Sequence, residues 1–517
     1  MSCFTRQFRT HRTAATFVLF VCAAFATDSV MAQRTIALSA LAPDAGFRID
    51  GLADGDLLGI NSDAIGDFNG DGLDDFLVSA EEAQSGRGST YVVFGRSNGF
   101  PDGVSLEQLD GLNGFRLDGA PYEGFNHRAR GAGDMNGDGR GDLILGLSSS
   151  NGFDGRACVI YGRATMDAIT TIDTLPSGQV TCMDGAQRYE NIGKSVAALG
   201  DFNGDGLDDV AIGTVHGDFA GADSGSVYLI YGRAPNLGRH IALEALDGMQ
   251  GFRIDGAAAD DRFGISVGSG DINGDGRADL IAGAERAGVP GAMQGTAYVL
   301  FGNDRRRDTP MSAAMLDGSR GFTIHTDTSF AFLGRAVGSA DMNHDGYDDV
   351  LVGTLQNHAY VVHGANTFPA RMDVDGLNGS NGFRIEGAQA GDRAGESIAG
   401  VGDVNGDGID DIGLGAQYAD AQGTDAGQVH VVFGHTAPRT ATLSLATWAD
   451  REGFTLAGTG AEDYCGLNIG RGGDLNHDGI ADLLLSCHGA STLGAYRGAA
   501  YVIHGERPVA LFKNGLE

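Results

Sequence analysis

The sequence is poor in proline, cysteine and aromatic residues, and it has few basic residues for its length. Only 10 of its 517 residues are proline, which excludes a collagen-like or polyproline chain. Aromatic residues make up 8%, whereas 85 residues are glycine, a balance typical of many tight turns between short strands. The formal net charge of −33 argues against nucleic acid or an anionic membrane surface as a partner.

The one long apolar run lies near the first residue. Arg6, Arg9 and Arg12 precede an apolar stretch over residues 14–26, which is too short to span a bilayer comfortably. This order is typical of a secretory signal peptide, which we place at residues 1–32, before Gln33. We therefore expect an exported protein, extracellular or periplasmic, with no membrane span.

A loop of nine residues recurs seven times. Each copy follows a strand-like segment such as GFRID and a Gly-x-Ser-Val-like segment, and it precedes apolar runs such as DDVAIG and VYLIYG. Short runs of Val, Ile, Leu, Phe and Tyr bounded by Gly and Asp predict four strands per repeat. The loop reads DFNGDGLDD from Asp67 and begins again at Asp134, Asp201, Asp271, Asp341, Asp403 and Asp474.

The repeats predict an all-β fold, a seven-bladed β-propeller with four antiparallel strands per blade. We disfavour an open array of hairpins because one repeat cannot bury both of its faces alone. If GFRID is the outermost strand of a blade, residues 46–50 complete the last blade and close the ring. Residues 33–517 then form a single domain, with repeats at about 46–95, 114–162, 178–232, 251–302, 321–364, 382–434 and 453–505.

Oxygen-bearing side chains alternate along each loop. Positions 1, 3, 5 and 9 are Asp, Asn, Asp and Asp, position 6 is Gly, and the carbonyl of position 7 adds a further oxygen. This ligand set suits Ca²⁺ before Mg²⁺. An EF-hand would need Glu at position 12, which is apolar in all seven copies. A single copy would fit an Asx-rich turn without metal equally well, but seven copies favour metal binding.

We predict up to seven Ca²⁺ ions, one in each loop. The first three loops supply Asp67, Asn69, Asp71, Leu73, Asp75, Asp134, Asn136, Asp138, Arg140, Asp142, Asp201, Asn203, Asp205, Leu207 and Asp209. The other four supply Asp271, Asn273, Asp275, Arg277, Asp279, Asp341, Asn343, Asp345, Tyr347, Asp349, Asp403, Asn405, Asp407, Ile409, Asp411, Asp474, Asn476, Asp478, Ile480 and Asp482.

Two short motifs inside the repeats have other readings. Residues 140–142 spell Arg-Gly-Asp, the tripeptide read by adhesion receptors, but Asp142 is position 9 of the second loop. Residues 264–268 match the Gly-x-Ser-x-Gly nucleophile elbow, yet Ser195 and Ser397 occupy the same repeat position as Ser266. We interpret both motifs as parts of the repeat.

The pattern Phe-Gly-x-Ser, Asp-x-Asn-x-Asp-Gly-x-x-Asp, Gly-Ala resembles the FG-GAP repeats of the integrin α-chain propeller. Residues 263–284 are the closest copy, and the resemblance covers about residues 46–505. It implies Ca²⁺ in hairpin loops on a lower face, and an upper, partner-binding face made by the loops joining strands 2 to 3 and 4 to 1. The second repeat departs from the pattern, with GFNHRARG in place of Phe-Gly-x-Ser.

The resemblance favours a non-enzymatic binding or adhesion module, and we expect a monomer that binds an extracellular protein or glycan. A phospholipase D that cleaves GPI anchors also carries such repeats, so a hydrolase that uses the propeller face is one alternative, and a purely structural repeat protein is another. The candidate contacts on the variable upper loops are Tyr122, Tyr189, Phe219, Tyr418, Tyr464 and Tyr496.

Four of the six cysteines lie beyond the signal peptide, and three pairings are open to them. The repeat phase places Cys158 in the third strand and Cys182 in the fourth strand of one blade. Cys465 and Cys487 lie on the two strands that flank the loop beginning at Asp474. Because adjacent antiparallel strands bring opposed Cβ atoms close, we predict the disulfides Cys158–Cys182 and Cys465–Cys487.

Overall fold

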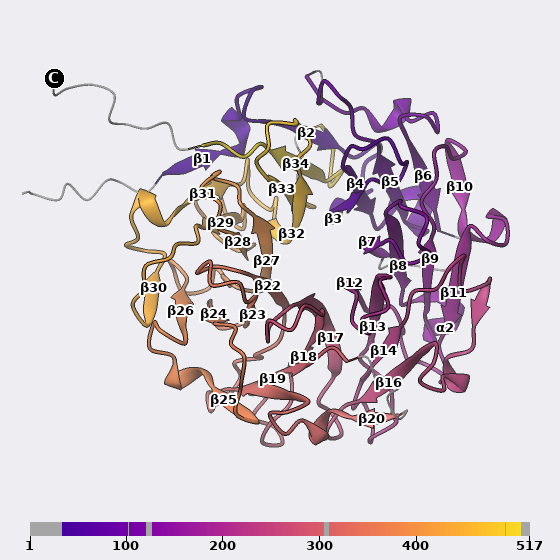
Figure 1. Ribbon diagram of the computed structural model, residues 1–517. Coiled ribbons are helices and arrows are strands. Elements are labelled where there is room, and N and C mark those ends of the chain that lie inside the picture. Colours follow the sequence, from indigo (N-terminus) through magenta and orange to yellow (C-terminus); the bar gives the residue numbers. More distant parts are fainter. Residues whose placement is uncertain (1–33, 102, 120–126, 304–309, 492, 508–517) are drawn as a thin grey trace, which may run out of the picture.

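Seven β-sheets stand around a central axis in the computed structural model (Figure 1). The structure describes residues 34–101, 103–119, 127–303, 310–491 and 493–507. The expected signal peptide at 1–32 lies outside these residues. Each sheet is one blade, and its first strand lies nearest the axis. The predicted seven-bladed propeller is confirmed.

Four antiparallel strands follow one another outward in each blade, as in blade 3, where the pairs run in sequence order. Blade 1 holds β3 (Leu58–Gly66), β4 (Asp75–Ala80), β5 (Ser89–Val93) and β6 (Gly114–Asp118). Blade 2 holds β7 (His127–Gly133), β8 (Asp142–Leu147), β9 (Arg156–Ile160) and β11 (Val180–Asp184). Blade 3 holds β12 (Ser195–Gly200), β13 (Asp209–Thr214), β14 (Ser226–Ile230) and β16 (Gly251–Asp255).

The remaining blades repeat this order. Blade 4 holds β17 (Phe263–Gly270), β18 (Asp279–Ala284), β19 (Thr296–Leu300) and β21 (Gly321–His325). Blade 5 holds β22 (Val337–Ala340), β23 (Asp349–Gly353), β24 (His358–Val362) and β26 (Gly382–Glu386). Blade 6 holds β27 (Ser397–Gly402), β28 (Asp411–Ala416), β29 (Gln428–Val432) and β31 (Gly453–Ala457). Blade 7 holds β32 (Cys465–Gly473), β33 (Asp482–Cys487), β34 (Ala499–Ile503) and β2 (Gly46–Asp50).

Six of the sheets carry a fifth strand, which the sequence did not predict. It is short and pairs in parallel with the fourth strand. For blades 1 to 5 it comes from the chain between strands 3 and 4 of the next blade. Blades 2 to 6 therefore each add one strand to the outer edge of the blade before them. These outer strands are β10 (Ile169–Thr171), β15 (His240–Ile241), β20 (Met311–Ser312), β25 (Arg371–Asp373), β30 (Thr442–Ser444) and β1 (Thr35–Ala37).

Two N-terminal strands close the ring. β2 pairs antiparallel with β34 from Gly46 opposite Ile503 to Asp50 opposite Ala499, as predicted for residues 46–50. β1 adds to blade 6 by pairing in parallel with β31. These two N-terminal strands therefore complete blade 7 and extend blade 6, and β2 forms the outer edge of blade 7.

Helices are short and confined to connections. The two α-helical turns lie between strands 2 and 3 of blades 1 and 2, at α1 (Ala83–Gly86) and α2 (Ser150–Phe153). The 3₁₀ turns are η1 (Leu38–Ala40), η2 (Leu106–Gln108), η3 (Ile172–Thr174), η4 (Leu243–Ala245), η5 (Ala313–Met315), η6 (Val374–Gly376) and η7 (Asp450–Glu452). Within the described ranges, no helix has the length and apolar character needed to cross a membrane.

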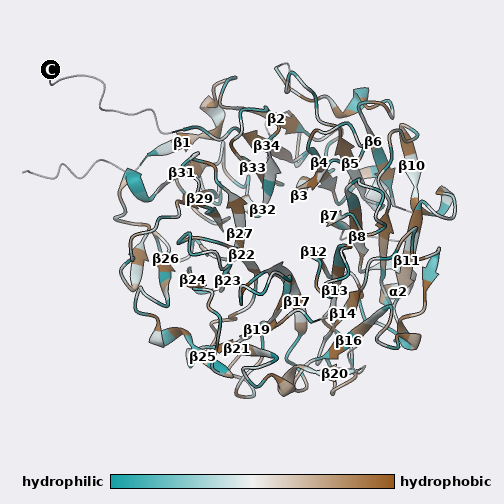
Figure 2. Ribbon diagram, viewed as in Figure 1, coloured by the Kyte–Doolittle hydropathy of each residue, from teal (hydrophilic) through white to brown (hydrophobic). Residues whose placement is uncertain are grey.

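The core lies between blades rather than at the axis. Phe76 and Val78 of blade 1 pack with Leu484 and Val502 of blade 7, and all four are fully buried. Full burial of such a side chain stabilises by roughly 1.5–3 kcal/mol. Figure 2 shows hydrophobic colour along the strands and hydrophilic colour in many of the connecting loops. The blades therefore hold one another in place and fix the loops on both faces.

Candidate metal centres and loop faces

The seven Asp-rich loops join strands 1 and 2 of each blade, and we call the face that carries them the lower face. Position 9 is the first residue of strand 2, and its Asp side chain is fully buried in all seven blades. In blade 4, Asp279 Oδ2 accepts from the N–H of Ile272 at 3.0 Å, and Oδ1 accepts from the N–H of Gly302 at 2.7 Å. The position-9 carboxylate thus ties its loop to the end of strand 3.

The same two bonds recur around the ring. The Gly N–H that follows strand 3 donates to the position-9 Asp at 2.7–3.0 Å in every blade. The position-2 N–H donates to its second oxygen at 2.9–3.2 Å. A buried carboxylate with several N–H donors satisfies groups that would otherwise be costly to bury. Position 9 is therefore part of the blade as well as a predicted metal ligand.

Positions 1, 3 and 5 shape the turn itself. In the first loop, Asp67 accepts from the N–H groups of Gly70, Asp71 and Gly72 at 2.6–2.9 Å. Asn69 Oδ1 accepts from Asp71 N–H at 2.8 Å, and Asp71 Oδ1 accepts from Leu73 N–H at 3.0 Å. These side chains are turned inward onto the loop, and the other loops repeat the arrangement.

The carboxylates within a loop repel one another. Burial is the main cause that raises the pKa of Asp75 and Asp279 at position 9, and the charges at positions 5 and 1 raise it further, while the N–H donors lower it. The pKa reaches about 7 for Asp75 and about 8 for Asp142, Asp209, Asp279 and Asp411. Three acids close enough to disfavour each other's charge are a donor set that a divalent cation would stabilise.

The residues fit a hard cation by chemistry, although their side chains are not drawn together around one point. Across the part of the chain that the structure describes, no three His, Cys, Asp or Glu side chains are grouped so as to hold a metal ion. The acids instead accept backbone N–H bonds, and the Asn amide and position-7 carbonyl would supply the remaining oxygens. Each carboxylate oxygen has a second lone pair, so these bonds leave room for a cation.

The Arg-Gly-Asp tripeptide is not displayed. Asp142 is fully buried and accepts from the N–H groups of Met135 and Gly162. The Arg140 side chain lies against Gly70 of the preceding loop, where a Cβ would meet its Nε at 2.6 Å. A receptor cannot reach a buried carboxylate, so the interpretation of this motif as part of the repeat agrees with the structure.

Ser266 of the nucleophile-elbow match also has a structural contact. Its Oγ donates to the carbonyl of Gly334 in the next blade at 2.9 Å. Ser195 and Ser397 make the same bond to Gly264 and Gly466, at 2.8 and 2.6 Å. The serine of the repeat therefore links neighbouring blades, and no helix follows it.

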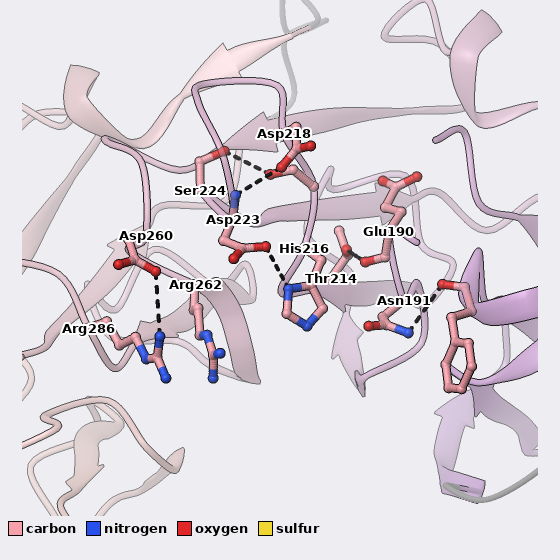
Figure 3. Close-up of polar contacts among 12 residues, drawn as sticks. Glu190, Asn191, Thr214, His216, Asp218, Asp223, Ser224, Asp260, Arg262 and Arg286 are labelled. Atoms are coloured by element: carbon pink, nitrogen blue, oxygen red, sulfur yellow. Dashed lines mark hydrogen bonds and ion pairs between the residues drawn. The ribbon is translucent and has the colours of Figure 1, made fainter. Parts of the chain in front are cut away.

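Interlocked loops form the opposite, upper face. The strand 4–1 connection of one blade donates a backbone N–H to the strand 2–3 connection of the blade before it, as from Asp260 to Ala222 at 2.8 Å. Figure 3 shows this surface at blades 2 to 4, where His216 Nδ1 lies 2.7 Å from Asp223 Oδ1 and Arg286 pairs with Asp260 at 3.4 Å. Loops joined in this way hold their side chains on a rigid frame.

The predicted upper-face contacts fall into two groups. Tyr189 and Tyr496 are 57% and 46% exposed, and each lies on an interlocked loop. Phe153 and Phe330, which sequence reasoning did not select, are each 55% exposed on the same kind of loop. The repeat phase could have identified both residues, because it places Phe153 in a strand 2–3 connection and Phe330 in a strand 4–1 connection.

The other predicted contacts pack within the protein. The Tyr418 and Tyr464 rings meet edge to face at 5.9 Å, and Tyr464 stacks on His488 at 5.5 Å. The guanidinium of Arg253 lies 3.4 Å from the centroid of Phe219. Tyr122 lies outside the described residues.

Both predicted disulfides are present. Cys158 of β9 lies directly opposite Cys182 of β11, with their Cα atoms 4.1 Å apart. Cys465 of β32 lies opposite Cys487 of β33, with Cα atoms 4.0 Å apart. Each disulfide joins two strands of one blade, which confirms the strand phase used to predict it.

A family model for the FG-GAP repeat matches residues 60–93, 193–230, 263–300, 333–363 and 394–432. These segments hold the first three strands of blades 1, 3, 4, 5 and 6. The chain is an FG-GAP repeat protein. Blades 2 and 7 lie outside the matched residues, but they have the same strand order as the other blades. They also depart from the repeat locally, with Arg128 in place of the serine in blade 2 and Cys465 in place of the phenylalanine in blade 7.

Curated relatives place this FG-GAP protein near integrin α chains. It is 29% identical to integrin alpha-5 of Xenopus laevis over 43% of this chain and 19% of the relative. It is 29% identical to integrin alpha pat-2 of Caenorhabditis elegans over 50% of this chain and 21% of the relative. A phosphatidylinositol-glycan-specific phospholipase D of Dictyostelium discoideum is 28% identical over 33% of this chain and 19% of its own length. The matches thus span about a fifth of each relative.

Proposed function

We propose that this FG-GAP protein is an exported, calcium-binding propeller that acts as a binding or adhesion module for an extracellular protein or glycan. The observation that carries the proposal is the difference between its two faces. The lower face repeats one acidic loop seven times, whereas the upper face varies its loops and exposes Phe153, Tyr189, Phe330 and Tyr496. Variable loops on a repetitive frame are where binding sites commonly lie.

Calcium would be held by positions 1, 3, 5 and 9 and the position-7 carbonyl of each loop. Bound Ca²⁺ would supply positive charge between three carboxylates that otherwise repel one another. The position-9 Asp also accepts a hydrogen bond from the glycine that follows strand 3, so the charge of the bound Ca²⁺ would stabilise the blade as well as the loop. Chelation should therefore lower the melting temperature, because a ligand that binds only the folded state stabilises by about 2.7 kcal/mol at 100 times its Kd.

Binding by the upper face can be tested with paired variants. Phe153→Ser with Tyr189→Ser removes two exposed rings at the junction of blades 2 and 3 while leaving the lower loops intact. Leu112→Ser with Met249→Ser, two residues that are each 71% exposed in strand 3–4 connections, is the matched control. Capture of cell-surface or matrix material should fall for the first pair and persist for the second. Equal capture by both pairs would refute an upper-face site at this junction.

Hydrolysis is the alternative function, because phospholipase D relatives match at similar identity. The His216–Asp223 pair on the upper face is an arrangement that could orient an imidazole for general-base chemistry (Figure 3). The purified mature chain should show no turnover on ester, phosphodiester and glycoside panels. Turnover that His216→Gln abolishes would replace the binding-module proposal with an enzymatic one.

A further inference from the structure

We propose that Arg128 and Lys194 form a binding site for an oxyanion group, a carboxylate or a sulfate, where the inner strands of blades 2 and 3 reach the upper face. The site does not depend on calcium or on the adhesion role proposed above, although it would select acidic ligands if the upper face binds one. Four features of the molecule support it.

The two cations lie at equivalent heights on neighbouring inner strands. Arg128 of β7 pairs with Gly146, and Ser195 of β12 pairs with the equivalent Gly213. Lys194 precedes Ser195, and its N–H donates to Gly213 O at 3.1 Å. The inner strands β7 and β12 are neighbours around the axis (Figure 1). Arg128 therefore stands where blades 3, 4 and 6 place the serine that links blades.

Other cations at this level are paired with acids. Arg335 lies 3.1 Å from Glu285 and 3.5 Å from Glu396, and Arg262 lies 3.4 Å from Glu285. The charges contributed by blades 4 to 6 are thus compensated.

Arg128 and Lys194 lack such a partner. Among the residues with a described structure, neither has a carboxylate within ion-pair distance, and the Arg128 Nη1 donates only to the Ile60 carbonyl, at 3.3 Å. Glu81 attracts both charges from farther away. Arg130, two residues along β7, lies 3.9 Å from Asp63.

The positive charge of Arg128 disfavours the protonated form of Lys194. Burial lowers the pKa of Lys194 to about 8, and the nearby charges of Arg128 and Arg335 lower it further, against the opposing effect of Glu81 and Glu285. Burial is the main cause that lowers the pKa of His488, and the charge of Arg128 lowers it further; the buried His488 Nδ1 has no hydrogen-bond partner among the described residues. An oxyanion between Arg128 and Lys194 would relieve this repulsion, and a guanidinium fork matches its geometry.

The site would take one acidic group rather than a polyanion. Glu81 attracts both cations from farther away, so it would repel further negative charge on the ligand. The shared chemistry is therefore a single carboxylate or sulfate at the end of a ligand. A carboxylate site and a sulfate site can be distinguished by whether acetate or sulfate binds.

The lysine content gives a direct measurement. The chain has two lysines, Lys194 and Lys513, so reductive methylation with ¹³C-formaldehyde of a Lys513→Arg protein labels Lys194 and the N-terminal amine alone. Methylation keeps the positive charge. The pKa of Lys194 would be followed by NMR in the calcium-saturated mature chain with sodium chloride, sodium acetate or sodium sulfate at equal ionic strength.

We expect acetate, sulfate or both to raise the pKa of Lys194 by about 1 in a saturable manner. Arg128→Gln should abolish this response, whereas Arg451→Gln, which removes an 84% exposed cation elsewhere, should preserve it. Saturation by acetate alone assigns a carboxylate site, and by sulfate alone a sulfate site. No saturable response, or the same response in Arg128→Gln, would overturn the proposal.

A second measurement guards against misfolding. Lys194→Met keeps the apolar stem and removes the charge, and calorimetric titration of the unlabelled variant with the same salts should show no binding heat above chloride. Its melting temperature without oxyanion should equal or exceed that of the parent, because one of two repelling cations is gone. Undiminished binding by a folded Lys194→Met protein would also refute the site.

Discussion

Asp208 Oδ2 accepts the backbone N–H of Asp134 at 2.6 Å, so the eighth residue of one lower loop holds the first residue of the loop in the preceding blade. Asp348 and Asp74 make the same bond to Asp271 and Asp474, at 2.8 and 3.1 Å. The residue before position 1 is Gly in these blades, and a Cβ on Gly133 would collide with the Asp208 carboxylate. The loops are therefore linked from blade to blade.

The first prediction concerns this link. Asp208→Ala should lower the free energy of unfolding by about 1.5 kcal/mol, because a charge-assisted hydrogen bond is lost. Asp410→Ala is the matched control: its carboxylate lies 3.4 Å from Asp341 N, where Ala340 replaces the glycine. Denaturant titration should show a smaller loss for Asp410→Ala. Equal losses would contradict an energetic role for the short bond.

The second prediction separates metal binding from structure within one loop. Asp275→Ala should reduce bound calcium by one equivalent with little effect on stability in chelator, because this side chain is exposed and bonds only within the loop. Asp279→Ala should also unfold at lower denaturant in chelator, since Ile272 N–H and Gly302 N–H lose their acceptor. Calcium counting and denaturation with EDTA measure the two effects. Unchanged calcium content in both variants would remove the metal from this loop.

A third prediction follows from the two disulfides. Replacing Cys465 and Cys487 with Ala should destabilise blade 7 by about 3 kcal/mol, given a sequence separation of 22 residues. Blade 7 is completed by β2, so the same variant should also expose residues 46–50 to protease earlier than the parent. The Cys158→Ala, Cys182→Ala variant should lose a similar amount of stability without that early cleavage. Identical cleavage patterns would show that opening does not begin at the junction.

The fourth prediction is a pH dependence that resides in His430. Burial lowers its pKa to about 4, and its Nδ1 lies 2.9 Å from Thr455 Oγ1. The unfolded state, with a pKa near 6.5, binds the proton more readily, so stability present above about pH 6.5 is lost as the pH falls toward 4. The loss from this group is of order 2–3 kcal/mol.

His430→Gln should flatten the acid limb of the stability curve relative to the parent. The exposed His240, whose side chain is 58% exposed, provides a matched control, and His240→Gln should leave the curve unchanged. Denaturant midpoints between pH 7 and pH 4.5 measure the difference. A parallel fall in the parent and His430→Gln would assign the acid sensitivity to other groups.

The repeat, its seven blades and both disulfides were determined by local sequence. Alternating Asp and Asn, the apolar runs beside them and the phase of the GFRID segment each report on one strand or one turn, and a strand's neighbour in an antiparallel hairpin is fixed by the turn between them. That is why Cys158 and Cys182 could be paired, and why residues 46–50 could be assigned to blade 7.

Contacts between blades were decided only by the tertiary structure. The sequence did not show that β1 would pair with β31, that Asp208 would hold Asp134, or that Arg128 and Lys194 would lie at neighbouring inner strands with no described carboxylate within ion-pair distance. These relationships depend on the distance and angle between neighbouring sheets, which the packing of large side chains such as Phe76 against Leu484 determines. The repeat pattern predicts the strands and turns of each blade, whereas the geometry of the closed ring determines which residues of neighbouring blades come into contact.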